Sequence, residues 1–200
     1  MKIPEALYHY TVGPKLSLIA KSRHLAPTGY GLATSKKEKP VLWFSENCQW
    51  EPTATKVIST DGGKTFRRPE VRELQQFVGI YRFRLDTRNL EALNAAGIKL
   101  LPWTRLQTIA RFDPRDINDM VTTGMTLGAT PMHWWGVMEP VPVSLEVSGL
   151  LRLEICIHTG NDNPDTWDRI SLADAITAWE SRGLRVKQTT TSQTSMARGL

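Results

Sequence analysis

The sequence predicts an α+β domain of about six strands and four or five helices. Short apolar segments bounded by Gly, Pro or polar residues recur along the chain, which is typical of strands. Between them lie longer segments with apolar residues at helical spacing, several of which begin at a proline, as helices often do. A chain of 200 residues is also long enough to bury the core of one ordinary domain.

The beginning of the chain alternates strand, helix and strand. Residues 6–11 form a largely apolar segment that predicts the first strand. Gly13-Pro14 then starts a helix, which we expect to end near His24. After a loop rich in Gly, Pro and Lys, residues 40–45 are nearly all apolar, which predicts a strand covered on both faces.

The next segment, residues 46–68, is irregular. A turn signal at Asp61-Gly62-Gly63 predicts a hairpin between residues 55–60 and 64–68. We expect the following helix to run from Pro69 to about Phe77, because a proline suits the first turn of a helix.

Residues 80–85 alternate strictly between apolar and polar side chains, which predicts a half-buried strand with Arg82 and Arg84 on one face. That face could meet solvent or an anionic ligand, and we expect solvent. The remaining chain is expected to contain helices at 88–96, 103–111, 114–124 and 171–182, strands at 132–138, 141–147 and 150–158, and a loop at 159–165. Residues 188–200 are rich in Ser and Thr and lack aromatic residues, so we expect a single domain over 1–187 and a disordered tail.

Composition excludes several classes of protein. No segment approaches the ~18 consecutive apolar residues that cross a bilayer, and the N-terminus does not resemble a secretory signal, so we expect a cytoplasmic protein. Cys48 and Cys156 lack the spacing of metal ligands, and we expect reduced thiols and no metal. The sequence contains no phosphate-binding loop, dinucleotide fingerprint or hydrolase motif.

Candidate binding residues occur together in the first two predicted strands. They are His9, Tyr10 and Thr11 in the first strand and Trp43, Phe44 and Ser45 in the second. Aromatic and polar side chains in one place can stack on a flat ligand and hydrogen-bond to it, so we expect a nucleotide cleft there. Two alternatives remain open: His9 as a core histidine, and Trp43 and Phe44 as core residues, of which only one can face a cleft.

The same residues resemble a known family. His9-Tyr10-Thr11 on a first strand, a helix holding Leu18-Ile19, and Trp43-Phe44-Ser45 on the next strand are similar to the ADP-ribosyltransferase superfamily. The similarity is greatest to its branch of DNA-modifying toxins, RNA 2′-phosphotransferases and small bacterial or phage proteins. The resemblance covers about the first sixty residues, and it implies a split, mostly antiparallel sheet with peripheral helices.

The resemblance also implies a function. His9 would hold the ribose on the nicotinamide side of NAD, Trp43 or Phe44 would stack on nicotinamide, and Thr11 and Ser45 would hydrogen-bond to the ribose or carboxamide. The protein would then use NAD as a substrate and transfer ADP-ribose to a nucleic acid or a protein, as a toxin or phage effector with an antitoxin or another regulator as a partner.

The catalytic carboxylate is not fixed by the resemblance. Glu139, between the Trp134-Trp135 segment and Pro140, is the best placed candidate, and Glu51, beside the second strand, is the alternative. A carboxylate near the ribose would stabilise the positive charge that develops when the bond to nicotinamide breaks.

Two other functions fit the same sequence. The net charge of +5, with basic residues such as Lys36, Lys37 and Lys39, suits a non-catalytic nucleic-acid-binding module that uses Trp residues for stacking. A partner-binding protein whose aromatic residues simply form the core is the third interpretation.

Overall fold

An antiparallel sheet of seven strands organises the computed structural model, which describes residues 2–27, 38–59, 64–160 and 163–181. The strand order is β5-β6-β3-β1-β4-β8-β9, and a second, two-stranded sheet pairs β2 with β7. The strands are β1 (Ala6–Val12), β2 (His24–Leu25), β3 (Leu42–Ser45), β4 (Ile80–Asp86), β5 (Leu101–Pro102), β6 (Trp134–Val137), β7 (Val141–Pro142), β8 (Leu151–Gly160) and β9 (Asn163–Arg169). The α+β class and the mostly antiparallel sheet are therefore as predicted.

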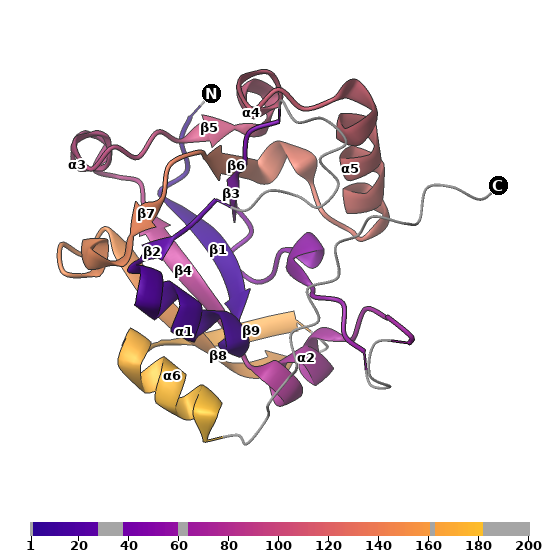
Figure 1. Ribbon diagram of the computed structural model, residues 1–200, viewed down its shortest axis with the longest axis vertical. Coiled ribbons are helices and arrows are strands. Elements are labelled where there is room, and N and C mark those ends of the chain that lie inside the picture. Colours follow the sequence, from indigo (N-terminus) through magenta and orange to yellow (C-terminus); the bar gives the residue numbers. More distant parts are fainter. Residues whose placement is uncertain (1, 28–37, 60–63, 161–162, 182–200) are drawn as a thin grey trace.

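Helices connect and cover these strands (Figure 1). The α-helices are α1 (Gly13–Ser22), α2 (Val71–Val78), α3 (Leu90–Ala95), α4 (Trp103–Ile109), α5 (Pro114–Thr126) and α6 (Leu172–Glu180). Short 3-10 helices occur at η1 (Pro52–Ala54), η2 (Pro131–His133) and η3 (Val143–Glu146). No helix in the described ranges has both the length and the apolar character needed to cross a bilayer.

The sheet divides into two halves between β1 and β3. All seven residues of β1 pair with β4, and all four residues of β3 pair with β6. Between β1 and β3, in contrast, the only paired residues in the described chain are Tyr8 and Ser45. In Figure 1 the group β5-β6-β3 accordingly lies above the group β1-β4-β8-β9. We call the place where β1 and β3 meet the β1/β3 junction.

Each half of the sheet has its own covering helices. α1 and α6 lie side by side over the β1-β4-β8 half, where Leu16 and Ala175 join the main core. Leu106 of α4 packs with Trp134 on the β6 side. At the start of α1, a Cβ on residue 13 would lie 2.5 Å from the Val78 carbonyl oxygen, so this position requires a glycine. Gly13 is also one of the two residues from which the start of this helix was predicted.

Local signals predicted several boundaries correctly. β1 and α1 begin where expected, and Gly79 ends α2 in a backbone conformation with a φ of 67° that glycine adopts without strain. Ser171 caps α6, and its hydroxyl oxygen accepts a hydrogen bond from the Asp174 amide at 3.1 Å.

Three predicted segments differ from the structure. The strand expected at 141–147 ends at Pro142, which cannot donate a backbone hydrogen bond, and a 3-10 helix follows. The strand expected at 132–138 begins only at Trp134, because Pro131 starts a 3-10 turn. The loop expected at 159–165 is partly wrong, since β8 extends to Gly160 and β9 starts at Asn163.

Other predictions fall partly or wholly outside the described residues. The hairpin expected around residues 61–63 is represented by one antiparallel bridge between Ile58 and Arg67, and residues 60–63 lie outside the described residues. Most of the loop before β3, with Lys36 and Lys37, and the tail at 188–200 also lie outside them.

The expectation that Arg82 faces solvent is wrong. Its side chain is buried, and its Nε donates to a carboxylate oxygen of Glu154 at 2.5 Å. Its guanidinium lies between the rings of Tyr8 and Trp167, with centroids at 4.6 and 4.0 Å. The alternating pattern misleads because both faces of β4 are covered, and an arginine can be buried when a carboxylate and aromatic rings surround it.

Candidate functional site

His9 lies at the β1/β3 junction. Its Nδ1 is 2.9 Å from the backbone carbonyl oxygen of Trp43, and its ring centroid is 5.8 Å from that of Phe44. A carbonyl oxygen only accepts hydrogen bonds, so the proton of the neutral ring is on Nδ1 and Nε2 carries a free lone pair. The residue as a whole is half-buried, and its imidazole is the part that lies deep in the protein.

The electrostatic surroundings keep His9 uncharged at neutral pH. Burial is the main cause that lowers the pKa of His9 to about 4, and the bond to Trp43 opposes this change only in part. The positive charge of Lys56 lowers the pKa further. His9 therefore presents a neutral acceptor, Nε2, rather than a cation.

The predicted site residues divide between the two faces of the sheet. Side chains along a strand point alternately to its two faces. His9, Thr11 and Phe44 share the face of the main core, and Tyr10, Trp43 and Ser45 share the other. The structure thus places three of the six residues, His9, Thr11 and Phe44, on one face of the sheet. Trp43 and Phe44 face opposite sides, as alternation along a strand requires.

Tyr10 belongs to the core on its face. Its hydroxyl donates to the backbone carbonyl of Asn47, and its ring contacts those of Trp50 and Trp167 at centroid distances of 4.9 and 5.9 Å. Burial raises the pKa of Tyr10 well above its usual value, so the phenol stays protonated. These contacts hold the chain that follows β3 against β1.

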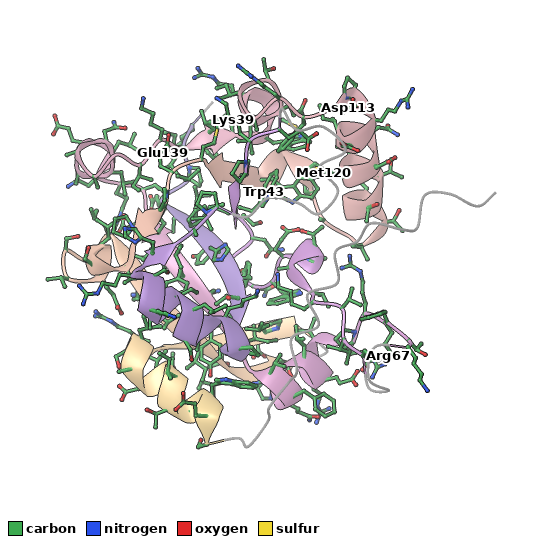
Figure 2. All side chains as sticks on the ribbon, viewed as in Figure 1. Lys39, Trp43, Arg67, Asp113, Met120 and Glu139 are labelled. Atoms are coloured by element: carbon green, nitrogen blue, oxygen red, sulfur yellow. The ribbon has the colours of Figure 1, made fainter. Side chains whose placement is uncertain are left out.

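Trp43 is part of an aromatic cluster under α4 and α5. Its ring centroid lies 6.0 Å from that of Trp103, 5.9 Å from that of Phe112 and 6.4 Å from that of Trp134. Met120 of α5, labelled with Trp43 in Figure 2, packs against the same cluster. This ring environment places Trp43 on the opposite face from His9.

Glu51 is a buried carboxylate held by neutral donors. The hydroxyl of Ser45 donates to Oε2 at 2.7 Å, the hydroxyl of Thr53 donates to Oε1 at 2.7 Å, and the indole N–H of Trp134 donates to Oε1 at 3.2 Å. Hydrogen bonds of this kind satisfy a buried carboxylate without a cation. Glu51 therefore joins β3, η1 and β6 on the face opposite to His9.

Glu139 lies far along the strands from Glu51. It is exposed in the turn that follows β6, and the pairing of Leu42 with Val137 puts that turn at the beginning of β3. Glu51 bonds to Ser45, at the other end of the same strand. Figure 2 shows Glu139 on the side of β6 toward β7, away from Met120.

Sequence reasoning missed Glu46. The indole N–H of Trp135 donates to Oε1 of Glu46 at 2.7 Å, and the Glu46 amide donates to the His133 carbonyl at 3.0 Å. Trp135 is paired with Phe44 and belongs to the main core, so Glu46 points to the face that carries His9. The signal in the sequence was its position two residues after Phe44, which puts both side chains on one face.

Positive charges gather beyond His9. Lys56 follows η1 in the chain. Arg68 donates a hydrogen bond at 3.3 Å to the backbone carbonyl of Thr55, the residue just before Lys56. Although Lys56 reaches solvent, the surrounding protein lowers its pKa, and the charges of Lys15 and Arg68 add to this effect. This region favours anions.

The part of the chain that the structure describes contains no group of three His, Cys, Asp or Glu side chains able to hold a metal ion. Cys48 is exposed and Cys156 is buried, and both are free thiols.

The chain is thus an α+β protein with a neutral histidine at the junction of two half-sheets and a carboxylate, Glu46, on the same face of the sheet. Its sequence matches no protein-family model, and no curated protein or solved structure is significantly similar to it.

Proposed function

We propose that this chain is an ADP-ribosyltransferase-like enzyme that binds NAD at the β1/β3 junction and transfers ADP-ribose to a nucleic acid or protein acceptor. The observation that carries the proposal is His9, a neutral imidazole of fixed tautomer placed where the sheet divides. The resemblance of the His9 and Trp43-Phe44-Ser45 segments to that superfamily points to the same chemistry.

The residues around His9 suit the parts of NAD. The free Nε2 accepts a hydrogen bond from a ribose hydroxyl, which an imidazolium could not do. Phe44, only 2% exposed, packs against the imidazole and holds its orientation, so its role is support rather than stacking on nicotinamide. The positive charge of Lys56 and its neighbours suits the pyrophosphate.

Binding and cleavage of NAD test the proposal directly. NAD at about 100 times its dissociation constant should stabilise the native protein by about 2.7 kcal/mol, seen as a rise of several degrees in melting temperature. Release of nicotinamide, followed by chromatography, should fall at least tenfold in His9→Asn. His24→Asn is the matched control. The Nδ1 of His24 also contacts a backbone carbonyl, that of Ser22 at 2.8 Å, but His24 lies in β2, away from the β1/β3 junction.

If NAD, ADP-ribose and nicotinamide leave the melting temperature of the wild-type protein unchanged and no nicotinamide is released, the proposal is wrong. Nucleic-acid oligomers belong in the same screen, because binding of oligomers alone would favour the nucleic-acid-binding module. That alternative has less support, since the ring of Trp43 packs against other aromatic rings instead of forming an open stacking surface.

A further inference from the structure

We propose that Glu46 is the carboxylate that serves the His9 site, where it binds the ribose next to nicotinamide and accepts the proton of the attacking group. The inference rests on the proposed function and deepens it, because it replaces Glu139 and Glu51 by a residue that the sequence did not single out. It is argued from position, from available hydrogen-bonding atoms and from the chemistry of the ligand.

Contacts in the structure link Glu46 to His9. The His9 ring contacts Phe44 at 5.8 Å, and Phe44 pairs with Trp135 in the β3–β6 register. The indole N–H of Trp135 in turn donates to Oε1 of Glu46 at 2.7 Å. Trp135 is only 1% exposed, so this hydrogen bond holds the carboxylate in one orientation on the face of His9.

Glu46 also has an oxygen available for a ligand. Among the described residues, no group donates a hydrogen bond or contributes an ion pair to Oε2, and the side chain is half-buried and reaches solvent. Both oxygens of Glu51, in contrast, accept hydrogen bonds from protein groups, and its residue is 7% exposed. Glu139 is exposed and lies at the opposite end of β3.

The two available atoms define the chemistry of the ligand. Nε2 of His9 and Oε2 of Glu46 are both acceptors, so the group they bind must donate hydrogen bonds, as the two hydroxyls of a ribose do. A carboxylate also favours a positively charged ring over a neutral one. This end of the site therefore suits the nicotinamide riboside part of oxidised NAD, and the phosphates belong near Lys56.

The transfer step is balanced with these groups. The bond from the ribose carbon C1′ to the nicotinamide nitrogen breaks, and its electron pair neutralises the ring. The acceptor's nucleophile then forms a bond to C1′, and its proton passes to the Glu46 carboxylate and from there to water. The negative charge of Glu46 stabilises the positive charge that develops at C1′ before the new bond forms.

Glu46→Gln tests the inference, because the amide keeps the shape and an oxygen for the Trp135 N–H but removes the charge. We expect it to bind ADP-ribose within about threefold of wild type by calorimetry, to lose the preference for NAD over NADH, and to release nicotinamide about 100-fold more slowly. Glu91→Gln removes an exposed carboxylate in α3, far from the candidate site residues in the sequence, and is the matched control with unchanged rates.

A second variant guards against a folding defect. Glu46→Asp keeps the negative charge but moves it back by the length of one methylene group. We expect it to release nicotinamide at a rate between those of wild type and Glu46→Gln. Its rate should also fall at low pH, whereas the rate of Glu46→Gln should not. If wild type releases nicotinamide and the folded Glu46→Gln releases it equally fast, Glu46 is not the carboxylate, although the proposed function stands. If wild type neither binds nor cleaves NAD, both proposals are wrong.

Discussion

His9 makes the stability of the protein depend on pH in a way that can be calculated. An unfolded histidine has a pKa of 6.5, and burial at the β1/β3 junction lowers the pKa of His9 to about 4. The unfolded chain therefore binds a proton at this position more readily than the native protein does. The contribution of this difference to stability is complete above pH 6.5 and is lost as the pH falls toward 4.

The magnitude follows from these two pKa values. Between pH 7 and pH 5 the difference should reduce the free energy of unfolding by about 2 kcal/mol, with about 3 kcal/mol lost by pH 4. For a domain of this size, a loss of about 2 kcal/mol lowers the melting temperature by about 4–8 °C.

The comparison uses His9→Asn, whose amide nitrogen can still donate to the Trp43 carbonyl but which does not titrate. Urea unfolding of both proteins at several values of pH between 7 and 5 should give free energies that converge by about 2 kcal/mol as the pH falls. Effects of all other titrating groups cancel in this difference. Curves that stay parallel within about 0.5 kcal/mol would refute the reasoning, because the imidazole would then be as well solvated as in the unfolded chain.

Two further predictions concern packing elsewhere. Arg82→Met should reduce the free energy of unfolding by about 3 kcal/mol in urea titrations, because it removes one of the two arginines that pair with the buried Glu154 at 2.5 Å and leaves only Arg152. Arg84→Met on the same strand should cost less than about 1 kcal/mol, and equal losses would contradict the burial of Arg82. Gly124→Ala should lower stability by about 1–3 kcal/mol and change tryptophan fluorescence, because the new Cβ would lie 2.5 Å from the Trp134 ring; an unchanged spectrum would contradict that contact.

Much of the fold could be predicted because local signals determine it. Gly13-Pro14 and Ser171 start helices, Gly79 ends one, and the apolar segments form strands that lie near the expected boundaries. β9 was missed because its sequence, with a proline and three charged residues, resembles a loop, and its strand conformation comes from pairing with β8.

The site was harder to predict, because its composition depends on strand register. The rings of His9 and Phe44 are in contact, but alternation along β1 and β3 sends Tyr10, Trp43 and Ser45 to the other face. The one local signal for Glu46 was its position two residues after Phe44, and the distant Trp135 fixes its orientation.

The adjacent residues Trp134 and Trp135 donate to carboxylates on opposite faces, and their partners Glu51 and Glu46 are 83 and 89 positions away in the sequence. Closing so long a segment carries a large entropic cost, so the β3–β6 half should assemble late in folding, after the β8–β9 hairpin, whose partners are close in sequence. A nascent chain therefore keeps Glu46 without its Trp135 donor until most of the protein has emerged from the ribosome.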